Sequence, residues 1–177
     1  MVERALLGAI VAALITALAR RLQALDESGQ WAAFACGILA SAGGWPWAIV
    51  LVGYFVLATA VTKLGEAEKQ RRTEHSVPQV NMRNAFQVAA NGAVFAMLAV
   101  RAGNHPEGMA GLAAAGALAA ASADTWATEI GTLWGGAPRS ILTGRRIATG
   151  MSGGLTVPGT LASLVGAALV EIGRAHV

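Results

Sequence analysis

The stretch WAAFACGILASAGGWPWAIVLVGYFVLATAVT, residues 31–62, carries no charged side chain over its whole length. A helix that crosses the hydrocarbon core of a bilayer needs about 20 apolar residues, so this stretch is too long for a single crossing. In its middle, GGWPW (residues 43–47) combines a turn signal with two tryptophans of the kind found at membrane interfaces. We therefore predict two membrane helices joined by a tight turn.

The composition of the whole chain supports the same interpretation. Of its 177 residues, 55% are hydrophobic and only 13% are charged, about half the charged fraction of a soluble domain. The 22 glycines suit membrane helices that pack closely through small residues. The net charge of +3 and the lack of a basic tract interleaved with aromatic residues argue against nucleic-acid binding. The single cysteine, Cys36, excludes an internal disulfide. These features indicate an integral membrane protein.

The other charge-free stretches extend this prediction to the rest of the chain. We predict an all-α, polytopic membrane helix bundle of about six transmembrane helices, some of them short or broken, that forms one domain over residues 1–177. The expected helices cover residues 5–20, 31–43, 46–62, 84–101, 108–134 and 155–173, with long loops at 63–83 and 135–153. For the first helix a signal peptide ending in the ALA before Arg20 is an alternative, against which Glu3 argues.

The basic residues predict how such a bundle is oriented. With six crossings, ten of the 13 lysines and arginines fall on one side, and Arg4, Arg101 and Arg174 fall on the other. Positive residues collect on the cytoplasmic side of a membrane protein, so we expect both long loops to be cytoplasmic and both termini to lie outside. A prokaryotic-type plasma membrane is the expected location. Whether copies of the chain form a homo-oligomer stays open.

A first polar cluster stands at the start of the fourth predicted helix, in MRNAFQVAANG, residues 82–92. Arg83, Gln87 and Asn91 are spaced four residues apart and therefore form one stripe along a helix face. Such a stripe serves either to bind a ligand or to hydrogen-bond neighbouring helices.

A second cluster, SADTWATEIGTLWGG (residues 122–136), places Asp124 and Glu129 in an apolar helix, where an unpaired acid is costly. In an unbroken helix Thr125 and Glu129 share a face, whereas Asp124 and Glu129 point about 140° apart. The two acids meet at one ion only if the helix breaks or a substrate bridges them. Mg²⁺ needs only one or two carboxylates when phosphate oxygens complete its shell. The alternative is ion pairing with a nearby arginine: Arg139, Arg145 or Arg146.

A third cluster, TGRRIATGMSGGLTVPGT (residues 143–160), combines glycines, hydroxyls and two arginines before an apolar helix. Backbone N–H groups at such a helix start favour anions, Pro158 is compatible with the first turn, and Arg145 and Arg146 can neutralise phosphate charge. The stretch lacks the Gly-Lys-Ser/Thr ending of a Walker A loop, and a plain glycine-rich turn is the alternative. All three clusters are expected at the cytoplasmic face, which favours phosphoryl transfer onto a membrane lipid.

Several of these segments resemble the integral membrane family DUF92, which includes transmembrane protein 19 and the phytyl-phosphate kinase. The segments are FQVAANG, ASADTWATEIG and TGRRIATGMSGGLTVPGTLASLVG, with GGWPW and TKLGEAEK earlier in the chain. The resemblance implies a membrane kinase that converts a phytyl or prenyl monophosphate to the diphosphate with CTP or another nucleoside triphosphate and Mg²⁺. Its partners would be an isoprenoid phosphate lipid, the nucleotide and the bilayer.

Carried onto this sequence, the resemblance implies that Asp124 and Glu129 hold Mg²⁺ or polarise the acceptor, and that they act in catalysis together with Arg145. The substrate- and nucleotide-binding residues would be Arg83, Gln87, Asn91, Thr125, Thr143, Gly144, Arg146, Gly150, Ser152, Gly153, Gly154 and Thr156. Three other functions remain open from the residues alone: a CTP-dependent cytidylyltransferase acting on a lipid phosphate, a transporter of an ion or small solute, and a structural helix bundle.

Overall fold

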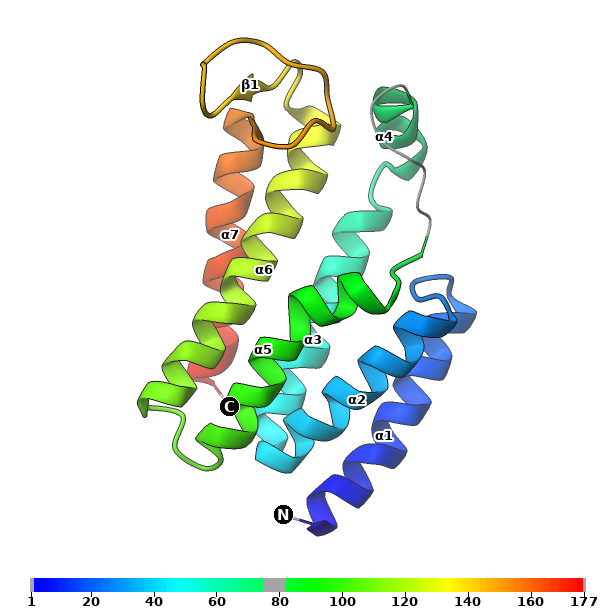
Figure 1. Ribbon diagram of the computed structural model, residues 1–177, viewed down its shortest axis with the longest axis vertical. Coiled ribbons are helices and arrows are strands. Elements are labelled where there is room, and N and C mark those ends of the chain that lie inside the picture. Colours follow the sequence, from blue (N-terminus) through cyan, green and yellow to red (C-terminus); the bar gives the residue numbers. More distant parts are fainter. Residues whose placement is uncertain (1, 75–81, 177) are drawn as a thin grey trace.

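A computed structural model describes residues 2–74 and 82–176 and confirms the all-α class (Figure 1). The described part of the chain forms α1 (Val2–Arg21), α2 (Glu27–Gly43), α3 (Trp45–Lys63), α4 (Glu66–Thr73), α5 (Ala85–Ala102), α6 (Met109–Trp134) and α7 (Val157–Ala175). The loop before α7 contains two short antiparallel strands, β1 (Arg139–Ser140) and β2 (Gly154–Leu155). The short helix α4 was not expected from the sequence. Helix α6 is unbroken, so no helix break brings Asp124 and Glu129 together.

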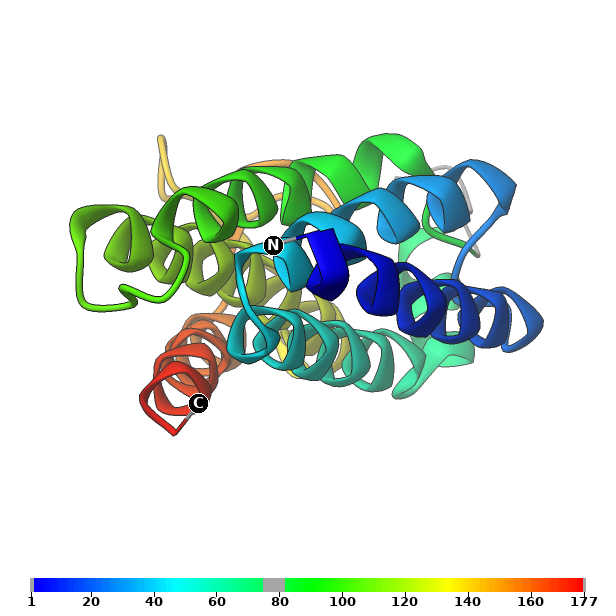
Figure 2. The same cartoon turned by 90° about the horizontal axis from the view of Figure 1, so that it is seen from below.

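The long helices run antiparallel from one to the next. Figure 1 shows α6 and α7 along one side of the bundle, α1 and α2 along the other, and α3 and α5 between them. Seen from below, α3 is flanked by α7 and by α1 (Figure 2). We call the end of the bundle that carries α4 and the loop of residues 135–156 the basic end, because most lysines and arginines lie there.

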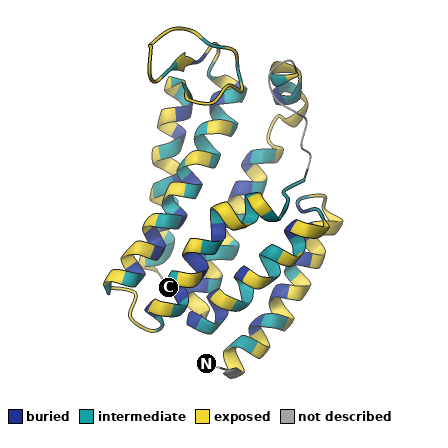
Figure 3. Ribbon diagram, viewed as in Figure 1, coloured by how far each residue is buried: buried dark blue, intermediate teal, exposed yellow. Residues whose placement is uncertain are grey.

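Three of the described helices, α3, α5 and α7, are long and apolar enough to cross a membrane, with mean hydropathies of 1.7, 1.4 and 1.2. Large apolar side chains also face outward on the other long helices, for example Leu14 on α1 at 68% exposure. Figure 3 shows these exposed residues along the outer faces of the bundle. Such outward apolar faces are expected where the solvent is lipid. The six-crossing topology remains a prediction.

The core lies where α3, α5 and α6 meet. Trp47 packs edge-to-face on Phe95 with ring centroids 6.0 Å apart, and its indole nitrogen donates to the Gly103 carbonyl at 2.9 Å. Most other core residues are alanines, among them Ala58, Ala99 and Ala114. Small side chains let the helices approach closely, which is how helices associate in membranes.

Helices α6 and α7 form the most closely packed pair. A Cβ at Gly159 would stand 2.7 Å from the Ala127 carbonyl oxygen, and Gly131 lies directly opposite. About two turns further along α7, the Gly166 carbonyl accepts from the Ser122 hydroxyl at 2.7 Å. The pair therefore acts as one rigid wall, and α6 presents its other face to the rest of the bundle.

Candidate functional site: a polar cavity between three helices

The first two polar clusters line one cavity of about 540 Å³ between α3, α5 and α6. Its walls mix apolar and polar groups, and it lies toward the basic end of the bundle. The polar lining residues are Gln23, Thr59, Thr62, Lys63, Glu66, Arg83, Gln87, Asn91, Asp124, Thr125, Thr128 and Glu129. The stretches around Arg83 and around Asp124 are far apart in sequence, so the fold itself brings them together.

Arg83 is placed by backbone hydrogen bonds and not by a helix. Its N–H donates to the Ala24 carbonyl at 3.2 Å, and its carbonyl accepts from the Asp26 N–H at 3.1 Å. Hydrogen bonds from the Gly29 backbone and the Ser28 hydroxyl hold the pKa of Asp26 below its usual value, so this carboxylate stays charged and caps α2. The loop before α2 and the residue before α5 are thereby locked together.

With its backbone fixed by these hydrogen bonds, Arg83 extends its side chain into the cavity. Its guanidinium donates to the Thr62 hydroxyl at 3.0 Å and lies 6.0 Å from the centre of the Phe55 ring. Among residues 2–74 and 82–176, no carboxylate pairs with it. A guanidinium that faces a cavity without an acidic partner is a ready site for an anion.

The predicted stripe of Arg83, Gln87 and Asn91 is only partly helical, because α5 begins after Arg83. Asn84 caps the helix, and the Gln87 side-chain oxygen accepts from the Asn84 N–H at 3.1 Å in a capping box. The side-chain oxygen of Gln87 is therefore engaged in capping α5. Asn91 lies further along the same wall of the cavity.

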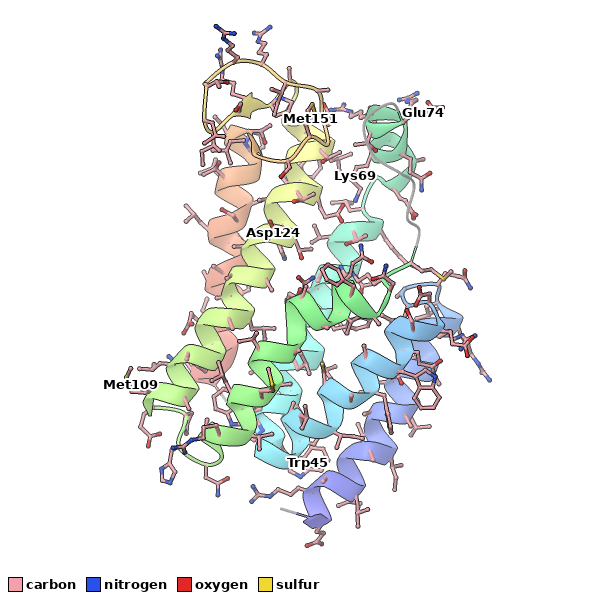
Figure 4. The ribbon with its side chains drawn as sticks, in the orientation of Figure 1. Trp45, Lys69, Glu74, Met109, Asp124 and Met151 are labelled. Carbon is pink, nitrogen blue, oxygen red and sulfur yellow. The ribbon has the colours of Figure 1, made fainter. Side chains whose placement is uncertain are left out.

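Asp124 lies on α6 between the two ends of the bundle (Figure 4). Its carboxylate is exposed to the cavity and forms no hydrogen bond or ion pair with any residue the structure describes. Thr125 and Thr128 line the cavity beside it, although the Thr125 hydroxyl already donates to the Ala121 carbonyl at 3.0 Å. Asp124 is thus an acceptor without a partner at the depth of the membrane helices.

Glu129 has a different environment. Its Oε2 accepts from the Lys69 ammonium at 2.5 Å, with side-chain exposures of 20% and 9%. Lys69 also donates to the Val61 and Thr62 carbonyls at the end of α3, at 3.2 and 2.5 Å, so its three donors are all used. The ion-pair partner of Glu129 is therefore Lys69 of α4. The alternative considered from the sequence, a pair with Arg139, Arg145 or Arg146, is wrong for Glu129.

The third cluster does not line this cavity. Residues 139–156 form a loop above α6 and α7 at the basic end (Figure 1), where Thr143, Gly144, Arg145, Arg146, Gly150, Ser152 and Gly153 are exposed. Gly154 is half-buried in β2, and the Thr156 hydroxyl caps α7 by accepting from the Gly159 N–H at 3.1 Å. Thr156 thus has a structural task, whereas Arg145 and Arg146 point to no acidic partner within the described chain.

Three charged residues of the cavity region were missed in the sequence: Lys63, Glu66 and Lys69. Lys63 donates to the Leu22 carbonyl at 2.5 Å and so joins α3 to the end of α1. All three lie in or next to TKLGEAEK, a charge-rich stretch that reads as a solvated loop. Two signals were available: the resemblance of TKLGEAEK to the family, and Gly65, whose φ of 61° turns the chain directly from α3 into α4.

The donor set fits Mg²⁺ held together with a phosphate, and not Mg²⁺ held by protein alone. No group of three or more acidic, histidine or cysteine side chains suited to a metal occurs in the described residues. Two carboxylates that line the cavity, those of Asp124 and Glu66, have no cationic partner among the described residues, although Glu66 accepts from the Gln70 amide at 3.2 Å. The second oxygen of Glu129 is not used by Lys69. Mg²⁺ is commonly held by one or two carboxylates with phosphate oxygens and water.

Comparison with known proteins shows what this chain is similar to. The family model described as integral membrane protein DUF92 matches residues 10–176. The chain is 28% identical over 183 residues to Protein PGR of Arabidopsis thaliana and 28% identical over 174 residues to an uncharacterized membrane protein of Methanocaldococcus jannaschii. Each alignment covers 96% of this chain, which spans 63% and 69% of those relatives. No solved structure matches.

Proposed function

The chain belongs to the DUF92 family of integral membrane proteins, and from that premise we propose that it is a kinase of isoprenoid monophosphates. An oxygen of the lipid phosphate bonds to the γ-phosphorus of CTP or another nucleoside triphosphate. The bond from that phosphorus to the bridging oxygen breaks, and the nucleoside diphosphate leaves. The product is an isoprenoid diphosphate, and the reaction takes place on the cytoplasmic side.

One observation carries the proposal: a single cavity within the helix bundle is lined by a carboxylate, Asp124, and a guanidinium, Arg83, and neither has an oppositely charged partner among the described residues. Charged groups at membrane depth are costly and mark functional sites. Transfer between two phosphates requires cationic groups for the anionic oxygens and an acidic group for the metal. This cavity offers both beside apolar helices.

Four of the lining residues and Lys69 then have a task. Arg83 binds the acceptor phosphate, Asn91 orients it, and Asp124 holds Mg²⁺, with the free oxygen of Glu129 within the same wall. Bound there, Mg²⁺ neutralises the charge of the phosphates. Lys69 keeps Glu129 and the end of α3 in place. The acceptor is already ionised near neutral pH, so the reaction needs no general base.

Arg145 and Arg146 are proposed to bind the nucleotide from the exposed loop. Since they lie outside the cavity, they would contact the nucleotide end of the donor and not the lipid. The variant Arg145→Gln/Arg146→Gln is therefore expected to raise KM for the nucleotide several-fold while KM for the lipid stays unchanged. A rise in the lipid KM alone would contradict this placement.

The experiment that tests the function uses the purified protein in detergent with Mg²⁺, γ-labelled CTP or ATP, and geranylgeranyl or phytyl monophosphate. Asp124→Asn is expected to lower formation of the labelled diphosphate by at least about 100-fold, as loss of a metal-binding group does. The matched control is Glu107→Gln, which removes an exposed carboxylate at the opposite end of the bundle and should leave the rate unchanged.

The other products of the assay identify the competing functions. Release of pyrophosphate and a cytidylylated lipid would make the protein a cytidylyltransferase. No product with a well-folded wild type, across both nucleotides and several chain lengths, would refute the kinase. Uptake into sealed vesicles without nucleotide would then support transport.

A further inference from the structure

A second cavity adjoins the polar one and is almost wholly apolar. It runs as a groove between α1 and α3, with α2 and α5 forming its floor, and we call it the α1–α3 groove. It exists because α1 packs mainly on α2 and leaves α3 uncovered on that side. Representative lining residues are Ala12, Ile15, Cys36, Leu51, Val88 and Gly92.

The groove and the polar cavity share three residues: Arg83, Gln87 and Asn91. At this junction a charged, hydrogen-bonding wall passes directly into a hydrocarbon-like one. From the junction the groove extends to Ser41 and Trp45 at the opposite end of the bundle. Along α2, the part from Glu27 to Ser41 is about 21 Å long at 1.5 Å per residue.

Two side chains of α3 have buried hydroxyl groups close to this junction. Neither the Tyr54 hydroxyl nor the Thr59 hydroxyl has a partner at hydrogen-bond distance among the described residues, and the Tyr54 hydroxyl lies beside Asn91 and Thr125. Because both oxygen atoms are inaccessible, neither contacts a ligand in the two cavities. The polar groups of the junction are therefore the side chains of Arg83, Gln87 and Asn91.

We propose that the α1–α3 groove holds the single hydrocarbon chain of a lipid monophosphate, whose phosphate lies at the junction against Arg83. This inference rests on the proposed function for the identity of the chain as isoprenoid. Apolar pockets with a few convergent polar groups are typical ligand sites, and the polar groups fix the orientation. Here they place the phosphate toward Asp124 and the hydrocarbon toward Trp45.

The place of the groove beside the polar cavity favours a lipid monophosphate over a bilayer phospholipid. A bilayer phospholipid carries two chains, and its phosphate is linked on both sides. A single-chain monophosphate presents a terminal phosphate to the cavity.

Photocrosslinking tests the inference without depending on catalysis. The probe is a C20 isoprenoid monophosphate with a diazirine at the chain end remote from the phosphate, added to the full-length protein in nanodiscs. Expected are crosslinked peptides from the groove faces of α1 and α2, suppressed by unlabelled geranylgeranyl monophosphate. Inorganic phosphate, geranylgeraniol and phosphatidic acid are not expected to suppress them.

A pair of glycine variants gives a second measurement. A Cβ at Gly92 would meet Cys36 and Leu51 across the groove at 3.8 and 3.9 Å, which is ordinary van der Waals contact, so Gly92→Leu directs a side chain into the groove. It should weaken binding of the C20 monophosphate by about tenfold or more, and binding of a C5 monophosphate much less. The control, Gly53→Leu on α3, has no atom within 4 Å and should bind as wild type.

Uniform labelling of all lipid-facing helices, or equal effects of the two glycine variants, would contradict the proposal that the groove holds the hydrocarbon chain. Groove labelling without kinase activity would support the groove and refute the kinase. Diphosphate formation with labelling confined to the outer face of α6 and α7 would support the kinase and overturn the groove. The two proposals therefore fail separately.

Discussion

At the scale of single residues, four of the charges at the cavity fall into two kinds. The other two, Lys63 and Glu66, bond to the Leu22 carbonyl and to the Gln70 amide. Lys69 and Glu129 satisfy each other, and Lys69 has no donor left for a ligand. Asp124 and Arg83 are satisfied by no opposite charge within the described chain. The first pair therefore holds the structure of the site, and the second two are available to a ligand.

Removing one partner of the Lys69–Glu129 pair should destabilise the protein. Lys69→Met leaves a carboxylate half-buried and two helix-end carbonyls without their donor, so we expect a loss of about 3 kcal/mol. Thermal unfolding in detergent measures it. The control is Glu171→Gln, which breaks the more exposed pair with Arg174 and should cost about 1 kcal/mol or less. Equal losses would show that Lys69 is not a structural anchor.

At the scale of elements, sequence periodicity was a good guide to the long helices and a poor one to α4. The long helices are decided locally, by runs of apolar residues that lipid and neighbouring helices both accept. Helix α4, Glu66–Thr73, is charged almost all round and has no apolar face. It is ordered through Lys69, a contact with α3 and α6 that no local pattern encodes.

The close approach of α6 and α7 gives a prediction at this scale. Gly159→Leu would force a side chain against the Ala127 carbonyl and Gly131, so we expect a loss of about 1–3 kcal/mol from overpacking. The measurement is again thermal unfolding in detergent. Gly173→Leu is the matched control on α7, because no atom lies within 4 Å of its Cβ position. A stable Gly159→Leu variant would mean that the two helices separate easily.

At the scale of the whole molecule, the sequence shows which polar residues fall within the predicted membrane helices, but not which of them come together in the fold. Helical spacing assigns Asp124 and Glu129 to faces of α6, yet it does not say that Asp124 faces Arg83 across a cavity or that Glu129 faces Lys69. It also grouped the loop of residues 139–156 with the other two clusters, whereas that loop lies outside the cavity. Such contacts depend on helix packing, which leaves no trace in the spacing of one segment.

The predicted orientation can be tested on the intact molecule. In a Cys36→Ala background, a cysteine is introduced by Leu142→Cys at the basic end or by Glu107→Cys at the opposite end; both positions are strongly exposed. A membrane-impermeant maleimide added to intact spheroplasts should label Glu107→Cys at once and Leu142→Cys only after permeabilisation. The reverse pattern would place the cavity on the external side, away from cellular nucleotides.

The way Arg83 is held has a consequence for how this site can change. Its contacts with the loop before α2 are made by its own N–H and carbonyl, which nearly any amino acid supplies, while its side chain reaches the cavity and contacts Thr62 and Phe55 of α3. The backbone of Arg83 thus joins the loop before α2 to the start of α5, while its side chain determines which ligand the cavity binds. The position can therefore be retuned, by evolution or by a designer, toward a different headgroup while the bundle around it is kept.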